Sequence, residues 1–187
     1  MSDLTITNAG VSVTKSTGAE VLSNNKKLNQ MKVDLIDVTL TTTAATHADG
    51  DVISQSIEIP NAVAVTGGTC ILQSIYLQNT DDSVESPALE LIFAAENTAL
   101  TSDIGDAVEI TDGNMVTAVI QGSATVTNWS TLLPTGNEFA VKSNVGLVLR
   151  AESDSRSIFV HTINRSGANF TPSGTGKLTA RIGFVQD

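Results

Sequence analysis

Two histidines and one cysteine are the side chains of this chain whose chemistry would suit catalysis or transition-metal binding. His47 lies in a polar stretch and could be a ligand, but no second histidine or cysteine stands at metal-binding spacing from it. His161 shares one side of an alternating apolar stretch with Phe159 and Ile163, which is typical of a histidine inside a sheet. Cys70 stands in a similar stretch, where a small buried residue is more common than a nucleophile.

Motifs of the common enzyme classes are missing from the sequence. There is no nucleophile elbow, phosphate-binding loop or dinucleotide fingerprint, and the carboxylate pairs fall in polar stretches where solvation explains them. The sequence therefore predicts a protein that is not an enzyme, with no catalytic, cofactor-binding or metal-site residues.

Calcium is the alternative that this reasoning leaves open. Residues 49–51, 81–82 and 103–112 bring several aspartates into turn-rich stretches, and carboxylate oxygens in flexible loops are the ligands that Ca²⁺ prefers. None of the three has the spacing of an EF-hand loop, and surface turns are rich in Asp and Gly in any case. We expect ordinary exposed turns here.

Composition narrows the classes of partner. The chain has 187 residues, of which 10 are basic and 20 acidic, for a net charge of -10. Phosphate neutralisation needs clustered Lys and Arg, so we expect no nucleic-acid partner and no anionic membrane partner. No apolar run approaches the roughly 20 residues of a membrane span, and a single cysteine excludes an internal disulfide.

Short alternating stretches rich in β-branched residues, separated by turn residues, fill most of the chain. We expect strands at residues 33–40, 52–59, 115–121, 139–142, 146–151, 157–164 and 178–185, a short one at 107–110, and one at 124–129 that either follows 115–121 or continues it. In 33–40 the apolar phase shifts between Leu35 and Ile36, which indicates a bulge or a segment buried on both sides. The spacing favours an all-β fold, an antiparallel two-sheet β-sandwich of immunoglobulin or jelly-roll type with no helix.

The stretch 69–95 is expected to be the centre of this sandwich. Its first apolar run places Ile71, Ile75 and Leu77 on one side and Leu72 and Tyr76 on the other, as in a strand covered on both faces. A polar, turn-forming loop separates it from a second run of alternating residues. We expect the two runs to pair as a central hairpin.

Residues 1–31 differ from residues 32–187, which form the sandwich domain. Leu4, Ile6, Val11 and Val13 alternate around an Asn-Ala-Gly turn and predict a small hairpin, and a polar stretch follows. Such a segment cannot bury enough surface alone to offset its ordering entropy. We expect an extended N-terminal arm, which is either ordered by a neighbouring subunit or a frayed terminus.

Two stretches together resemble a family of known proteins. One is HADGDVISQSIEIPNAVAVTGGTCILQSIYLQNTDD followed by ALELIFAAENTAL, and the other is RSIFVHTINRSGANFTPSGTGKLTARIGFVQD. They resemble virion structural proteins of tailed bacteriophages, of the capsid decoration or cement type. The resemblance covers residues 33–187 and consists of strand and turn patterns.

The resemblance implies a jelly-roll β-sandwich that sits on the outer capsid surface of the virion. It also implies a homotrimer, with the major capsid protein as partner, that stabilises the shell by bridging capsomers. One alternative is a host-recognition module of a fibre or tail that binds a glycan or receptor, for which Trp129 and Phe170 would be candidate contact residues. A metal-dependent enzyme on a β scaffold, such as a cupin, is the least favoured reading because the two histidines stand in unrelated contexts.

Overall fold

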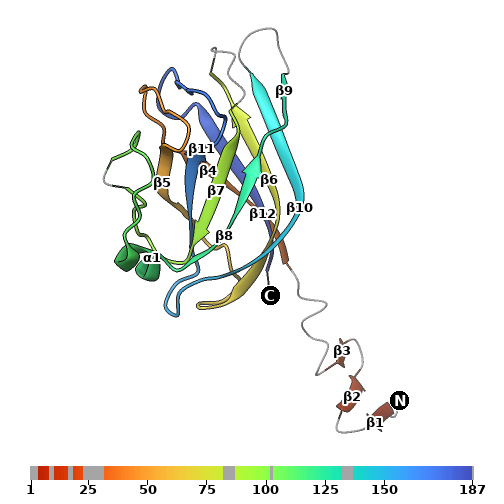
Figure 1. Cartoon of the computed structure of the whole chain (residues 1–187). Helices are drawn as coiled ribbons and strands as arrows, with labels where there is room; N and C mark the ends of the chain where they lie inside the picture. Colours follow the sequence, from red (N-terminus) through yellow and green to blue (C-terminus); the bar gives the residue numbers. More distant parts are fainter. Residues whose placement is uncertain are drawn as a thin grey trace.

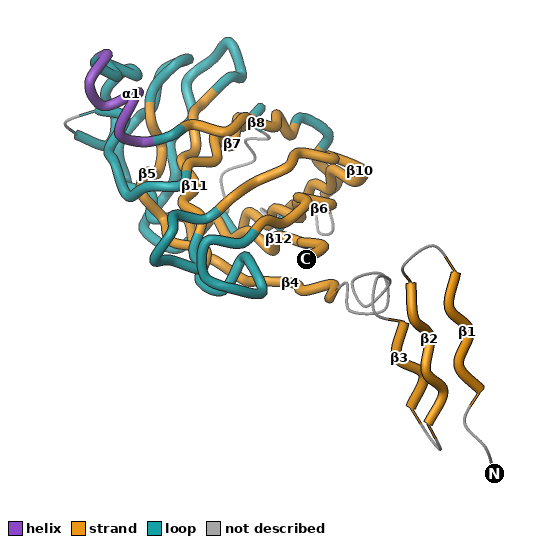
Figure 2. Tube along the Cα trace, turned by 90° about the horizontal axis from the view of Figure 1, so that it is seen from below, coloured by secondary structure: helices purple, strands orange, loops and turns teal. Residues whose placement is uncertain are grey.

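A computed structural model describes the backbone of residues 4–8, 11–16 and 19–22 and the full residues 32–81, 87–101, 103–131 and 137–186. Two antiparallel sheets pack face to face in the larger part (Figure 1). Viewed from below, the two sheets form two separate layers (Figure 2). The expected all-β sandwich is confirmed.

The strand order identifies the kind of sandwich. One sheet has five strands in the order β4 (Lys32–Leu40), β12 (Leu178–Gln186), β6 (Thr69–Asn79), β10 (Glu138–Arg150) and β9 (Trp129–Thr131). The other has four strands in the order β5 (Val52–Ile59), β11 (Ile158–Asn164), β7 (Leu89–Ala94) and β8 (Ile120–Val126). The chain crosses repeatedly between the sheets, so that β4-β12-β6-β10 faces β5-β11-β7-β8. This is the interleaved order of an eight-stranded jelly roll, with β9 added at one edge.

The core lies between the two inner faces. On β12 every second residue is buried, from Leu178 through Ala180 and Ile182 to Phe184, as the alternation predicts. Across the interface β7 contributes Phe93, which is also completely buried. Each sheet is therefore apolar on its inner face, and burying that face is the main stabilising contribution to the fold.

The buried residues of β6 do not follow strict alternation along the strand. Cys70, Leu72, Ile75 and Leu77 are all buried, although they do not share one parity. The pairing with β12 explains this, because Gly183 pairs with Ser74 and the next residue, Phe184, pairs with Leu72. The residue between them, Gln73, is an extra residue in a β-bulge. The strand is thus buried on its inner face, whereas its outer-face residues are half-buried and no described segment lies over them, so the expectation of cover on both faces is wrong.

The expected central hairpin is also wrong, since the two apolar runs belong to different sheets. β6 pairs with β10 and β12, whereas β7 pairs with β8 and β11. Both strands have an apolar inner face, and facing each other across the core buries both at once. Pairing side by side would have satisfied the backbone equally well, so the local pattern does not decide between the two arrangements.

The two separate strands expected at residues 139–142 and 146–151 prove to be one long strand with a bulge. Residues 139–142 and 146–151 do not fold back on each other but run on as β10, which pairs with β6 along its length. The register shifts between Ser143 and Leu147, and Asn144 and Gly146 have positive φ values of 56° and 73°. The turn-forming residues are therefore needed for a bulge that lies opposite Gln73.

One short helix, α1 (Asp112–Ala118), replaces the start of the strand expected at 115–121. Thr111 caps it, because its side-chain oxygen accepts a hydrogen bond from the Asn114 N–H at 3.2 Å. The expected strand at 107–110 is reduced to a single bridge between Asp51 and Ala107. Among the described residues, the one helix is far too short to cross a membrane.

Three further strands precede the sandwich. β1 (Leu4–Asn8) and β2 (Val11–Ser16) pair as the expected hairpin, and β3 (Ala19–Leu22) pairs with β2. A three-stranded sheet of this size is marginal in water without a surface to pack on. The division into an arm of residues 1–31 and a domain of residues 32–187 remains a prediction.

The inner-face position of Cys70 can be tested by thiol labelling. The side chain is 2% exposed, and burial raises the pKa of the thiol to about 12. We expect an aromatic disulfide reagent at pH 8 to react with native Cys70 at least ~1000-fold more slowly than with the urea-unfolded chain, because reaction requires opening of the core.

The matched control for this labelling is Val116→Cys in a Cys70→Ala background. Val116 lies on α1 and is 80% exposed, so its thiol should react at nearly the same rate in the native and unfolded proteins. Rapid labelling of native Cys70 would contradict the described phase of β6.

Candidate interaction surface

His47 ties together two loops at one end of the sandwich. Its backbone exchanges two hydrogen bonds of 2.8 Å with Phe170, and the Asn164 side chain donates to the His47 carbonyl at 2.9 Å. The ring is completely buried, with Nε2 3.4 Å from the Thr43 hydroxyl, and burial lowers its pKa. The residue therefore holds loops in place, and its ring is not presented to a ligand.

His161 lies on β11, on the same side of the strand as Phe159 and Ile163, as the alternation in the sequence predicts. Its Nδ1 accepts a hydrogen bond from the Ser56 N–H at 3.2 Å, and Ser56 has a positive φ of 56° in an irregular part of β5. Nε2 has no hydrogen-bond partner among the described residues. The ring is completely buried, and this burial lowers its pKa to about 4, so the histidine is neutral at pH 7.

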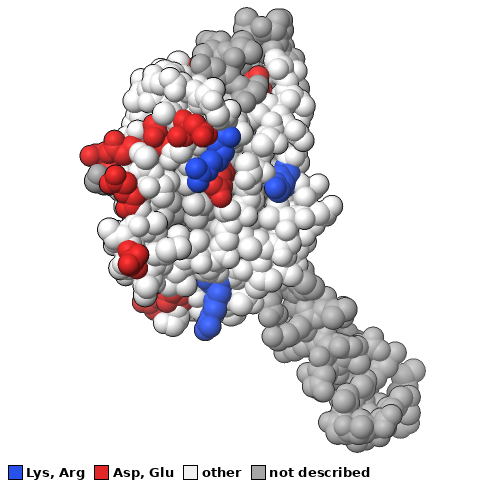
Figure 3. Space-filling view, in the orientation of Figure 1, with Lys and Arg blue, Asp and Glu red and all other residues white. Residues whose placement is uncertain are grey.

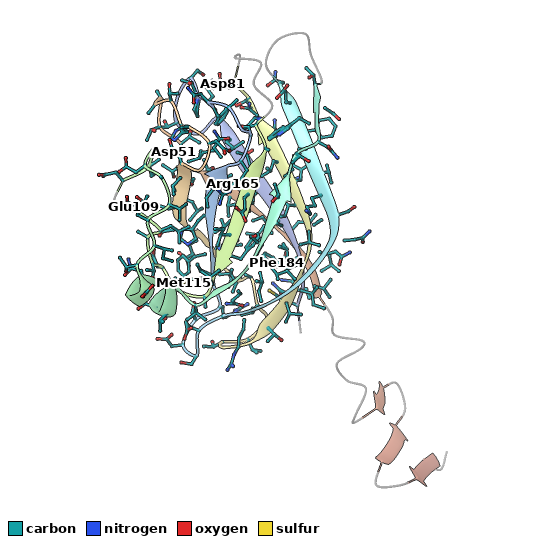
Figure 4. The ribbon with its side chains drawn as sticks, in the orientation of Figure 1. Asp51, Asp81, Glu109, Met115, Arg165 and Phe184 are labelled. Atoms are coloured by element: carbon teal, nitrogen blue, oxygen red, sulfur yellow. The ribbon has the colours of Figure 1, made fainter. Side chains whose placement is uncertain are left out.

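The aspartates of these stretches accept hydrogen bonds from the backbone of their own loop or of a neighbouring loop. Asp51 accepts a hydrogen bond from the Ala48 N–H at 2.6 Å, Asp49 accepts one from the Gly167 N–H at 3.0 Å, and Asp81 accepts one from the Ser173 N–H. Asp51, Asp81 and Glu109 lie in separate loops (Figure 4). Within the part of the chain that the structure describes, no three His, Cys, Asp or Glu residues gather closely enough to hold a metal ion.

The two aromatic residues singled out from the sequence belong to the core and its margin. Phe170 is 1% exposed, and Trp129 packs partly buried against the core while its indole N–H donates to the Pro87 carbonyl at 2.6 Å. A half-buried aromatic pair lies elsewhere. Tyr76 and Phe139, on neighbouring strands of the five-stranded sheet, stack with ring centroids 5.9 Å apart.

The outer faces of the two sheets differ in what covers them. Over the four-stranded sheet, the loop that follows β7 adds Leu100 to a second apolar cluster with Val52 and Ile163. Gln55 fixes this loop, because its side-chain oxygen accepts hydrogen bonds from the Leu100 and Thr101 N–H groups at 3.0 and 3.3 Å. The protein covers this outer face with its own chain.

The outer face of the five-stranded sheet has no such cover among the described residues. Val33, Leu35, Val141 and Val148 lie on it with exposed fractions of 68%, 60%, 52% and 63%. Strand β4 pairs with β12 in a continuous register and Leu35 is exposed, so neither the bulge nor the doubly buried segment expected at the phase shift is found. The second apolar phase of β4 instead faces outward. Apolar residues in both phases of an edge strand were the sequence signal for this surface.

A shallow hollow of about 260 Å³ lies on the same outer face. Beside the hollow, Arg181 and Asp37 form a bidentate ion pair, in which Nε and Nη2 of Arg181 donate to the two carboxylate oxygens of Asp37 at 2.6 and 3.0 Å. These hydrogen bonds lower the pKa of the Asp37 carboxyl. Tyr76 and Gln78 from β6 line the hollow on the other side. The hollow thus combines an aromatic ring with hydrogen-bonding groups.

Charge is distributed very unevenly over the sandwich. The strands of the five-stranded sheet contain three acidic and four basic residues, whereas the rest of the described sandwich contains twelve acidic and three basic residues. Figure 3 shows acidic side chains gathered around the loops on the side of β5 and α1. The uncovered sheet is therefore close to neutral, although the whole chain carries a charge of -10.

Comparison with known proteins identifies no family for this chain. No family model matches the sequence, and no curated protein matches it. Among solved structures, a chain of the virus-like particle of a nodavirus from the giant freshwater prawn Macrobrachium rosenbergii is similar, with a TM-score of 0.29 and 11% identity over 83% of this chain and 92% of that one. A TM-score this low carries no conclusion about family or function.

Burial of His161 predicts a loss of stability on acidification. The pKa of His161 is near 6.5 in the unfolded chain but about 4 in the native protein. The unfolded chain therefore binds the proton more readily, and protonation favours unfolding as the pH falls from about 6.5 to 4. We expect His161 alone to lower the free energy of unfolding by about 2 kcal/mol between pH 7.5 and pH 5.

Urea unfolding of wild type and His161→Asn at both pH values measures this contribution. Asparagine retains an acceptor for the Ser56 N–H but does not titrate, and the remaining groups titrate equally in both proteins. An equal pH dependence in the two proteins would show that His161 is accessible to protons in the native state.

Proposed function

We propose that this chain is a virion structural protein of the capsid decoration type, which binds the outer surface of a tailed-phage head as a homotrimer and bridges capsomers of the major capsid protein. The observation that carries the proposal is a nearly neutral apolar face that no described segment covers, on a jelly roll whose other outer face is covered by its own chain. Contiguous exposed apolar surface on a folded domain marks a site of protein contact.

The fold supports the proposal only as an analogy. Jelly rolls occur in viral capsid proteins, in lectins and in cupin enzymes, so fold alone does not decide among them. The side chains do more to separate these classes. The two histidines are buried in separate structural positions, one at a loop junction and one on β11, and among the described residues neither belongs to a cluster of His, Cys, Asp and Glu such as a cupin metal site needs.

A decoration protein of this kind would act by linkage. A protein that binds the assembled shell but not its free subunits stabilises the shell in proportion to the logarithm of its own concentration over its dissociation constant. Such a protein needs a rigid scaffold, a face for its own copies and a segment that reaches the shell. The strands of residues 1–31, which precede the rigid domain, are suited to the last of these roles.

Removal of residues 1–31 tests how the protein attaches to the shell. We expect the truncated chain to keep its unfolding midpoint in urea within error, because the described core lies within residues 32–187. Its affinity for capsids assembled from the major capsid protein of the same genome should fall at least ~10-fold. Co-sedimentation with those capsids measures the affinity.

The control in this experiment is the full-length protein on the same capsids. Undiminished binding of the truncated chain would move shell attachment to the loops of the sandwich. Failure of the full-length protein to bind would contradict the decoration function itself.

The hollow on the five-stranded sheet favours a second candidate, the host-recognition module. Tyr76 could stack on a sugar ring while Asp37, Gln78 and Arg181 exchange hydrogen bonds with its hydroxyl groups, as aromatic and polar groups do in sugar sites. We expect a glycan array to show no ligand if the protein is only a decoration protein. A ligand lost in Tyr76→Ala but retained in Trp129→Phe would support recognition instead.

A further inference from the structure

We propose that a second copy of this chain docks on the outer face of the five-stranded sheet, along a row of four apolar side chains that crosses four strands. The row consists of Val33, Val185, Ile71 and Val148. This inference names the surface used by the oligomer of the proposed function, and it does not depend on the identity of the shell.

The register of the strands builds the row. Val185 on β12 pairs with Val33 on β4 on one side and with Ile71 on β6 on the other, and Ile71 also pairs with Val148 on β10. Residues that pair directly across antiparallel strands project from the same face of the sheet. The inner-face residues next to them, Phe184 and Leu149, are completely buried in the core. The row therefore lies wholly on the outer side.

The surroundings of the row resemble the anatomy of a protein interface. Leu35 is the next outward-facing residue after Val33 on β4, and it is 60% exposed, so it extends the apolar row. Leu35 pairs across the strands with Gly183 on β12, which has no side chain. Next in this line across the sheet come the hydroxyl groups of Ser74 and Ser143. An apolar centre with a polar rim is the arrangement found in interfaces between protein chains.

A Cβ atom at Gly183 would collide with the Ser74 hydroxyl and would lie 3.1 Å from Leu35 Cδ2. Glycine therefore allows Leu35 and Ser74 to approach each other across β12. The result is a low, closely packed line of residues beside the apolar row, which suits the approach of a flat partner surface.

Electrostatics indicates which partner this face would accept. Two copies of a chain with a charge of -10 repel each other, and the repulsion is smallest where acidic residues are balanced by basic ones. The five-stranded sheet is that place, with three acidic and four basic residues on its strands. A basic partner would instead be drawn to the acidic loops on the other side of the molecule. The neutral apolar face is thus the part of the surface best suited to a second copy of the same chain.

The experiment is the solution mass of the full chain by light scattering after size exclusion, at protein concentrations from about 1 to 100 μM. We expect wild type to be an oligomer of the 19.5 kDa chain and Val33→Lys/Val148→Lys to run as a monomer, with a dissociation constant at least ~100-fold higher. The two lysines lower the net negative charge of each copy, so general repulsion between copies cannot explain a loss of association.

The matched control is Val116→Lys, which places the same charge at an 80% exposed valine on α1. It should keep the wild-type mass. The milder Val33→Thr/Val148→Thr pair nearly preserves shape and should weaken association by a smaller factor. Unfolding in urea shows whether each variant is folded.

Three results would overturn the inference: a monomeric wild type at every concentration, a folded double-lysine variant that keeps the wild-type mass, or equal disruption by Val116→Lys. The capsid experiment is independent of all three. A monomer that binds capsids would overturn this inference and the proposed homotrimer but not the attachment to capsids, and an oligomer disrupted by the lysines that binds no capsid would overturn only the decoration function.

Discussion

The structure depends on keeping the middle of the inner face of the five-stranded sheet apolar while the strands of that sheet change register. The register changes opposite the consecutive residues Gly183 and Phe184 of β12. At this point β6 contains one extra residue, Gln73, and β10 contains three, which end at Gly146. The extra residues are absorbed as bulges, so Leu72 and Ile75 both remain in the core. Without the bulges one half of β6 would turn its apolar residues outward, since a shift of one residue exchanges the faces of a strand.

Regular elements could be predicted from the sequence and irregular ones could not. β12 alternates strictly from Leu178 to Phe184, so its position and inner face follow directly from the pattern. β6 breaks the alternation, and only its partners show whether that break is a bulge or a second buried face. The helix α1 was hidden because a short apolar run suits either structure. Thr111 followed by Asp112, a capping residue and an acid in the first turn, was the available signal.

The candidate surface was accessible to sequence reasoning only in part. Val33 and Leu35 were visible as a second apolar phase in one strand, but a strand buried on both sides gives the same pattern. The decisive difference is what lies over each sheet, because Ile163 on β11 is covered by the loop that carries Leu100, whereas nothing in the described chain covers Val33. Which outer face is covered depends on contacts between segments that are distant in the sequence, and the pattern within one strand does not reveal those contacts. The separation of charge between the two sides also appears only when the strands are placed in space.

The position of β12 between β4 and β6 has a consequence for how the protein is made. Asp37 and Arg181, which face each other across β4 and β12, are 144 residues apart in the chain. Until β12 has left the ribosome, β4 and β6 lack the strand that lies between them. At a synthesis rate of ~5–20 residues per second, the time between the emergence of β6 and that of β12 is on the order of ten seconds. During that time the apolar inner faces of β4 and β6 are exposed, so we expect the nascent chain to be a substrate for chaperones and a slow folder once released.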